Sequence, residues 1–251
     1  MLHGFRGAHC GFLKIAKKLG DNYNLIIPDL PGYGATQPFT DSRHDIETYA
    51  SFLGDFIKAL ESQGQKVSHM LGYSLGATIA SRYVAQNPNT IDKLIFICPI
   101  ASRPIPKPLH HPLIAVAKTL YVMPERLSRP IVANDMIVGA LNLITIKTKD
   151  PMLKRWIKAE HYRCYNSFIA TKPMIETWID CMLCHVGQLA PKVPNETLVI
   201  HGCCDSVGKS KYQRDLHKLL PNARSREVCG TGHLVPHEAP EVVVEEIKKF
   251  I

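Results

Sequence analysis

The pentapeptide Gly-Tyr-Ser-Leu-Gly at residues 72–76 constrains the fold of this chain more than any other feature. An apolar run precedes it and a helical pattern follows it, so we expect a strand, a sharp turn and a helix in succession. Gly72 and Gly76 carry no side chain and therefore let the strand and the helix approach closely. Ser74 then occupies a strained turn with its hydroxyl exposed at the end of the strand, which is the position of a nucleophile.

Two polar residues further along the chain are suited to activate this serine. Asp205 follows the apolar run at 197–200, and His233 follows the candidate strand at 225–229, so each falls in a loop at the end of a predicted strand. We expect Ser74 to act as the nucleophile and His233 as the general base and then the general acid. Asp205 would orient the imidazole and stabilise its cation.

The segment His3-Gly4-Phe5 can supply the electrophilic part of the same site. We expect the backbone N–H groups of Phe5 and Leu75 to point at the oxygen that becomes negatively charged when Ser74 attacks a carbonyl. Removal of one such donor typically lowers the rate by about 10²–10³. His3 and Gly4 would support this turn, as the two glycines of the pentapeptide support the serine.

With these pieces in this order, the chain resembles the α/β-hydrolase superfamily, and within it the capped serine hydrolases of the esterase, thioesterase and carbon–carbon hydrolase kind. In that superfamily the nucleophile precedes the acid and the acid precedes the histidine. The resemblance implies an α/β fold, a mostly parallel sheet flanked by helices, with a helical cap inserted after the strand at 93–98. Five motifs carry it across nearly the whole chain: HGF at 3–5, DLPGYG at 29–34, GYSLG at 72–76, GCCD at 202–205 and GHLVPHEAP at 232–240.

The order of predicted elements agrees with this fold class, because strands that alternate with helices form parallel sheets. We expect strands at 25–27, 67–71, 94–97, 197–200 and 225–229, and helices at 11–19, 45–61, 75–86 and from 240 onward. Between 99 and 190 the strand signals stop and helical segments follow. We therefore expect a hydrolase core at 1–98 and 191–251, and a cap at 99–190 that excludes water and carries the specificity contacts.

The cap segment is strongly basic. Residues 99–192 contain 13 Lys and Arg against 6 Asp and Glu, a difference of +7 out of the formal +8 of the chain. This charge is explained either by a solvated basic helix surface or by attraction of an anionic substrate, such as a carboxylate-bearing metabolite or a coenzyme A thioester. We expect a small-molecule substrate and no nucleic acid, because no nucleic-acid module or aromatic platform is visible. The oligomeric state is left open.

Two apolar segments of the cap, at 113–122 and 131–144, have two interpretations. Most of these side chains are expected to be core by default. A surplus would be suited to line a pocket for an acyl group. The sequence does not separate these two uses.

Eight cysteines occur in the 251 residues. A chain of this length is no small disulfide scaffold, so we expect free thiols and a cytoplasmic protein. Cys181-Met-Leu-Cys184-His185 matches the C-x-x-C-H pattern of haem attachment, but it continues a helical pattern and is better explained by a packed helix. We expect no cofactor and no metal. No stretch approaches the roughly 20 apolar residues that span a bilayer, so we expect no stable membrane insertion.

A second histidine, His237, lies four residues after His233. The superfamily usually tolerates many residue types at this position, on the way into the last helix. We therefore expect His237 at the surface and outside the site.

Only Met1 and Leu2 precede the motif at His3. In the superfamily that the chain resembles, strands come before this motif, and one of them lies beside the strand of the nucleophile. An unpaired gap inside a sheet costs about 1–3 kcal/mol for each buried backbone group. We therefore expect either an upstream segment of some tens of residues or a strand supplied by another chain.

The site predicts a serine hydrolase that cleaves an ester or thioester of a small to medium substrate through an acyl-enzyme. Carbon–carbon bond hydrolases, lyases and acyltransferases reuse the same residues, so the reaction is not determined by them. A different class of function also remains: a non-catalytic member that binds a ligand under the cap, or the product of a truncated gene.

Overall fold

Four parallel strands form the sheet of the computed structural model, which describes residues 1–104 and 107–251. They lie side by side in chain order: β1 (His69–Tyr73), β2 (Lys93–Ile97), β3 (Glu196–Gly202) and β4 (Ala223–Val228). In the register of the first three strands, Leu71 lies opposite Ile95 and Ile95 opposite Leu198. The parallel sheet flanked by helices, expected from the sequence, is confirmed.

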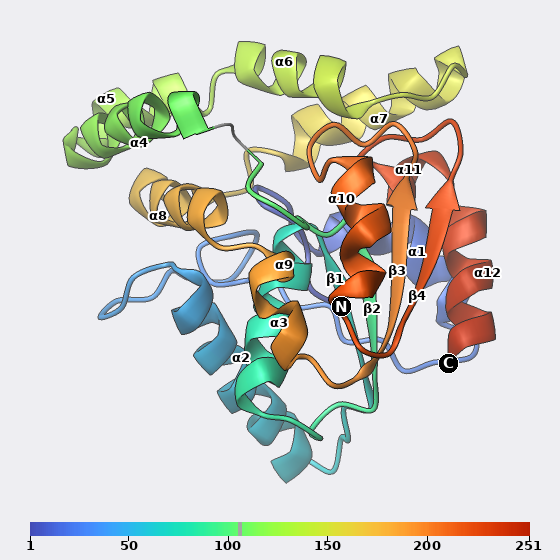
Figure 1. Cartoon of the computed structure of the whole chain (residues 1–251). Helices are drawn as coiled ribbons and strands as arrows, with labels where there is room; N and C mark the ends of the chain where they lie inside the picture. The colour runs from blue at the N-terminus through green and yellow to red at the C-terminus, as the bar shows by residue number, and fades with distance from the viewer. Residues whose placement is uncertain (105–106) are drawn as a thin grey trace.

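Alternate side chains of the strands supply two apolar cores, one on each face of the sheet. In β2, Leu94 and Phe96 belong to one core and Ile95 and Ile97 to the other, as the two-residue period of a strand requires. Helices α2 (Ile46–Ser62), α3 (Leu75–Gln86) and α9 (Val186–Leu189) cover the first face, and α1 (Leu13–Leu19) and α12 (Pro240–Phe250) the second (Figure 1).

The short helices complete the core. They are η1 (His9–Phe12), η2 (Ala190–Lys192), α10 (Ser210–Asp215), η3 (Leu216–Lys218) and α11 (Val235–Glu238). The helix expected at 75–86 has these bounds in the structure, whereas the one expected at 11–19 is divided into η1 and α1. Among the described residues, no helix combines the length and the apolar composition that crossing a bilayer requires.

The strand predicted at 25–27 is wrong, because the structure assigns no strand there. The segment has no ladder partner among the described residues, although the Met1 amino group donates a hydrogen bond of 2.6 Å to the Ile26 carbonyl. A cavity of about 290 Å³ lies between it and β1. Leu2 instead forms a single parallel bridge beside β1, with its N–H 2.7 Å from the Leu71 carbonyl oxygen.

Between β2 and β3 the described chain is helical and contains no strand, and residues 105 and 106 of the expected cap lie outside the described residues. We call the following five the cap helices: α4 (Lys107–Val122), α5 (Glu125–Val132), α6 (Asp135–Thr145), α7 (Pro151–Cys164) and α8 (Thr171–Leu183). They form a layer over the end of the sheet toward which β3 and β4 point (Figure 1). Cys181 lies in α8 and Cys184 directly after it, and both pack against the first core.

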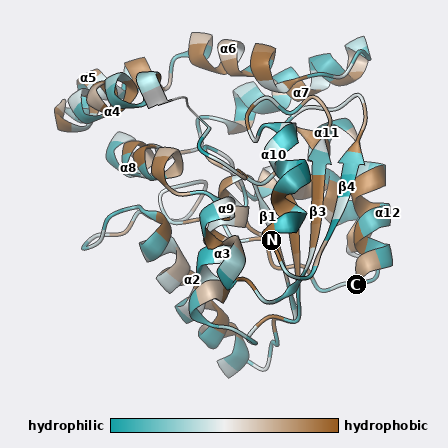
Figure 2. Ribbon diagram, viewed as in Figure 1, coloured by the Kyte–Doolittle hydropathy of each residue, from teal (hydrophilic) through white to brown (hydrophobic). Residues whose placement is uncertain are grey.

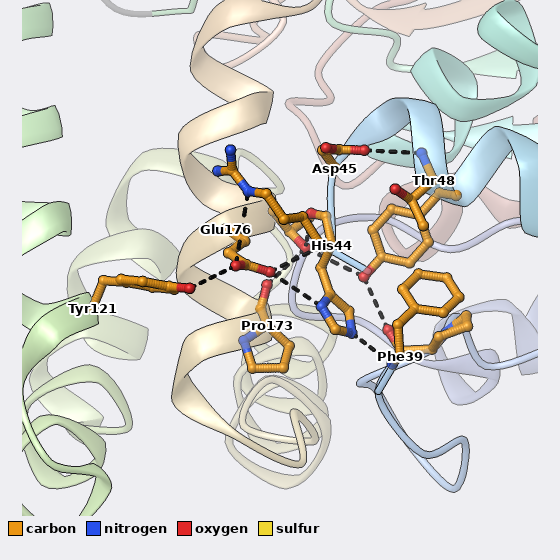
Figure 3. Close-up of polar contacts among 11 residues, drawn as sticks. Phe39, His44, Asp45, Thr48, Tyr121, Pro173 and Glu176 are labelled. Carbon is orange, nitrogen blue, oxygen red and sulfur yellow. Dashed lines mark hydrogen bonds and ion pairs between the residues drawn. The ribbon is translucent and has the colours of Figure 1, made fainter. Parts of the chain in front are cut away.

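A buried carboxylate in α8 joins the cap helices to the core (Figure 3). Glu176 accepts hydrogen bonds from the His44 backbone N–H at 2.9 Å and from the Tyr121 hydroxyl of α4 at 2.9 Å. His44 Nδ1 lies 3.3 Å from the same carboxylate, and His44 Nε2 accepts a hydrogen bond from the Phe39 N–H at 3.0 Å. Because Nε2 is an acceptor, the ring is neutral, and burial lowers the pKa of His44 accordingly.

Candidate active site

The nucleophile candidate lies at the turn between β1 and α3. Ser74 has φ 52° and ψ −110°, a backbone conformation that costs a non-glycine residue about 1–3 kcal/mol. Gly72 and Gly76 are required because neighbouring backbone atoms leave no space for a side chain at either position. A Cβ on Gly72 would lie 2.5 Å from the Gly76 carbonyl oxygen, and a Cβ on Gly76 would lie 2.2 Å from that of Leu2.

The structure brings the three predicted polar residues into one hydrogen-bonded row. Ser74 Oγ lies 3.0 Å from His233 Nε2, and His233 Nδ1 lies 2.9 Å from Asp205 Oδ2. Because Asp205 is an acceptor, His233 carries its proton on Nδ1, and Nε2 is free to accept the proton of the Ser74 hydroxyl. All three residues are less than a tenth exposed.

Asp205 is held as a carboxylate. Its Oδ1 accepts hydrogen bonds from the Val207 and Gly208 N–H groups at 2.8 and 2.9 Å, and its Oδ2 accepts one from Gln213 Nε2 at 2.9 Å. Burial opposes ionisation, but the neighbouring His233 and these donors lower the pKa of Asp205 to about 2. Gln213 also donates to the Pro99 carbonyl oxygen, and no sequence motif indicated it.

The oxyanion candidates are two backbone amides beside the serine. The N–H groups of Phe5 and Leu75 donate no hydrogen bond within the described part of the chain. His3 stabilises the turn that carries Phe5, because its Nε2 accepts the Leu30 N–H at 2.9 Å and its Nδ1 donates to the Gly4 carbonyl oxygen at 2.9 Å. Burial lowers the pKa of His3 to about 4, so the ring is neutral and structural.

A cavity of about 740 Å³ lies above Ser74. Its floor contains Ser74, His233, Phe5 and Leu75. Apolar side chains of the cap helices make up much of its walls, including Val116, Leu120, Ile131, Leu141, Ile144 and Trp178. The cap segment predicted as a possible acyl pocket therefore contributes to core and cavity together.

Arg6 directly follows Phe5 in the turn that carries the first oxyanion amide. It lines this cavity and has φ 59°. Its guanidinium donates to the Val132 carbonyl oxygen at 3.1 Å, to that of Tyr165 at 3.3 Å and to the Asn166 side chain. It also lies 5.3 Å from the Phe168 ring centre. None of these partners is a carboxylate, so a buried cation joins the core to the cap helices. No local sequence pattern indicates this role of Arg6.

The surface position predicted for His237 is wrong. His237 lies in α11, half-buried, and lines the cavity with its ring 5.9 Å from that of His161 and 6.1 Å from that of Trp156. Burial, His161 and Lys14 lower the pKa of His237 to about 3, and burial lowers that of His161 to about 4. Both rings are therefore neutral. The cap helix α7, which is distant in sequence, covers a residue that the local pattern placed at the surface.

Glu238, the residue after His237, stabilises the loop that carries His233. Its carboxylate accepts the Gly232 N–H at 2.6 Å, and also the N–H groups of Lys147 and Thr148 at 2.6 Å each. The turn before His233 is thereby attached to the segment that follows α6. No motif identified this role either.

One group of possible metal ligands coincides with the site. The ligand atoms of Cys98, Asp205 and His233 lie within 4.8 Å of one another. Asp205 and His233 are hydrogen-bonded to each other, and burial raises the pKa of the Cys98 thiol, which disfavours the thiolate that binds metals. We therefore assign these residues to the serine site rather than to a metal.

Comparison with known proteins identifies the family of the chain. Residues 1–246 match the model of the "Alpha/beta hydrolase family", and the chain belongs to that family. It is 26% identical over 254 residues to the uncharacterized hydrolase YugF of Bacillus subtilis, covering all of this chain and 88% of that protein. It is 27% identical over 256 residues to lipase 3 of a Moraxella species, covering 76% of it.

Solved structures of two esterases share the fold. The esterase of Thermogutta terrifontis with bound malate has a TM-score of 0.79 at 19% identity, over 99% of this chain and 86% of that one. The esterase of Exiguobacterium antarcticum has a TM-score of 0.80 at 19% identity, over 99% and 90%. At this identity the likeness concerns the fold.

Proposed function

We propose that this hydrolase cleaves carboxylic esters through an acyl-enzyme on Ser74. The observation that carries the proposal is the row Ser74–His233–Asp205 at the floor of a cavity. Beside the serine are two backbone amides that donate no hydrogen bond to a described residue. A nucleophile hydrogen-bonded to a base that is itself oriented by a carboxylate is the arrangement used for acyl transfer. The similarity to proteins named lipase and esterase supports the same reaction class.

The geometry accounts for each step. Ser74 Oγ attacks the ester carbonyl carbon while its proton passes to His233 Nε2, and the N–H groups of Phe5 and Leu75 bind the oxygen that becomes negative. His233 then returns the proton to the departing alkoxide, which leaves as the alcohol. Water, deprotonated by the same Nε2, attacks the acyl-enzyme and releases the acid. Asp205 remains a carboxylate throughout, because its folded-state pKa is about 2.

The cavity favours an ester with an apolar acyl group. Its volume of about 740 Å³ lies within the roughly 300–1,000 Å³ of small-molecule sites, and apolar side chains dominate the cap wall. A thioester would use the same groups. Carbon–carbon hydrolysis, lyase chemistry and acyl transfer also reuse this row, but no feature of the cavity favours them over ester hydrolysis.

The basic charge of the cap supports an anionic substrate only indirectly. None of the described Lys and Arg residues of the cap lines the cavity. Arg6, a core residue, is the cationic side chain that does so among the described residues. An anionic substrate would therefore be recognised by Arg6, and the cap charge requires another explanation. The eight cysteines are free thiols, which supports our proposal of a reducing, cytoplasmic location.

Covalent labelling with a fluorophosphonate, measured by intact mass, tests the proposal. We expect one adduct on the parent chain and none on Ser74→Ala or His233→Ala. Ser206→Ala is the matched control, because Ser206 lines the same cavity and should leave the adduct intact. A folded parent chain that forms no adduct, or an adduct that persists in Ser74→Ala, would contradict the assignment and favour the non-catalytic alternative. Ester and thioester panels would then define the acyl group.

A further inference from the structure

Helix α6 buries Val138 but exposes several other apolar side chains, and it buries two polar ones. Met136 is 81% exposed and Leu143 is 74% exposed, whereas Asn142 and Thr145 are buried at 2% and 6%. A helix at the surface of a globular protein normally has the opposite distribution. The outer face of α6 is therefore built to contact something less polar than water.

This exposure is concentrated on the cap helices. Of the 16 large hydrophobic side chains that are exposed in the described chain, 12 lie between residues 109 and 162. Figure 2 shows apolar colour along α6 at the top of the molecule, at the edge farthest from the lower end of the sheet. Single exposed apolar side chains are ordinary, but a cluster of this kind marks an interaction surface.

The exposed apolar surface is continuous with the cavity. Val116, Ile131, Ile137 and Ile144 are exposed and also line the cavity above Ser74. Together with Met136 and Leu143 they make up what we call the apolar rim. Four of the six rim residues therefore belong both to the outer surface and to the cavity wall.

The stretch of sequence that contains the rim is basic. Residues 109–163 contain nine Lys and Arg against four Asp and Glu. Lys118, Arg126 and Lys149 are exposed and form no ion pair with a described residue. Because none of the described basic residues of the cap lines the cavity, their charge acts on what lies outside it.

Exposed apolar side chains in a segment rich in lysine and arginine are a pattern of proteins that rest on anionic lipid surfaces. A second copy of this chain fits less well, because it would bring two positive caps together. We propose that the cap helices dock reversibly on an anionic lipid surface through the apolar rim. A lipid-borne ester would then enter the cavity directly from the bilayer. This second statement rests on the proposed function, whereas docking itself does not.

Sedimentation with vesicles tests docking independently of catalysis. The probes are phosphatidylcholine vesicles with and without phosphatidylglycerol. We expect the chain to sediment with the anionic vesicles, less with the neutral ones, and less at high salt, since salt screens surface charge. Ser74→Ala should bind like the parent chain, because the serine does not contribute to the rim.

The double variant Met136→Gln, Leu143→Gln tests the rim, since both residues are exposed and neither lines the cavity. We expect its vesicle partition coefficient to fall at least about tenfold, because the variant lacks two apolar side chains that the bilayer would bury on docking. The matched control is the double variant Tyr212→Gln, Leu219→Gln. Both of these side chains are 47% exposed, and both lie outside the cap helices. The control should bind like the parent chain.

Hydrolysis of a water-soluble ester should be equal in the parent chain and the Met136, Leu143 variant. A parent chain that does not sediment with anionic vesicles, or a rim variant that binds as the parent does, would overturn the proposal. A parent chain that remains in solution and self-associates through the rim would assign this surface to a protein interface instead. Binding without any ester hydrolysis would retain docking and reject the proposed function.

Discussion

At the scale of residues, the sequence indicated the three polar groups of the site but not what orients and supports them. Ser74, Asp205 and His233 each stand at the end of a predicted strand, so their types and their order were visible. Gln213 and Arg6 were not, because their partners lie in other elements and no local pattern records the contact. Orientation of a side chain depends on neighbours that are distant in sequence.

Asp205→Asn tests the role of the carboxylate. The amide cannot accept the Nδ1 proton in the same way and favours the wrong tautomer of His233, so kcat should fall about 10³–10⁴-fold. The measurement is kcat on a soluble ester with the circular dichroism spectrum as a check of folding. Asp215→Asn is the control, since Asp215 pairs with Lys218 at the surface. Activity within tenfold of the parent chain would show that Asp205 is not the orienting acid.

At the scale of elements, periodicity predicted most helices and the strands that pair with neighbours. The exception at 25–27 shows the limit of this signal. An apolar run predicts a buried extended segment, but a strand also requires a neighbour that pairs with it in a ladder. Among the described residues the segment 25–27 has no such partner, although the Met1 amino group donates one hydrogen bond to Ile26. Close contact between elements, as at α3 and Leu2, likewise depends on the position of both partners.

Substitution by alanine should change the free energy of unfolding in opposite directions at two helical glycines. Gly76→Ala in α3 places a Cβ 2.2 Å from the Leu2 carbonyl oxygen, so the free energy of unfolding should fall by at least about 3 kcal/mol. Gly139→Ala in α6 has its nearest neighbour at 3.4 Å, so it should gain about 0.5–1 kcal/mol from helix propensity. Urea unfolding of both variants measures the difference. Equal effects at the two positions would refute the packing of α3 against Leu2.

At the scale of the whole molecule, the cap helices change the environment of residues that belong to the core. His161 in α7 covers His237 in α11, and both rings are neutral beside an apolar cavity. His3, which precedes Gly4 and Phe5, is also buried. The described part of the chain therefore contains several histidines whose pKa is lowered by burial, among them His3, His161 and His237, so that protonation would place a charge in poorly hydrated surroundings.

The stability of the chain should consequently fall in weak acid. The folded-state pKa values of His3, His161 and His237 are about 4, 4 and 3, below the unfolded value of about 6.5. Their contribution is therefore complete above pH 6.5 and is lost as the pH falls toward 4, by up to about 1.4 kcal/mol per pH unit for each ring. Urea unfolding between pH 7 and pH 4.5 measures this slope.

A comparison of variants identifies the histidines responsible for this dependence of stability on pH. His161→Gln should reduce the slope, because one buried titrating ring is removed while an amide remains beside Asn142. His217→Gln should leave the slope unchanged, since His217 lies at the surface on η3. Stability that is independent of pH in this range would mean that the buried rings are accessible to water.

The sequence by itself determined the class of fold and indicated the residues of the candidate site. A strand, a glycine-flanked serine and a helix follow from local sterics, and the alternation of apolar runs follows from the period of each element. Such information is contained in a few neighbouring residues. The family match over residues 1–246 agrees with it.

The tertiary structure alone decided which residues surround the site and which face outward. Arg6 acquired its partners, and His237 its place in the cavity wall, only when α5 and α7 came to lie over the core. The outward apolar face of α6 could not be predicted either, because composition does not show which side of a helix packs against the rest of the protein. Burial and contact are properties of segments brought together from far apart in the chain, and only the folded molecule specifies them.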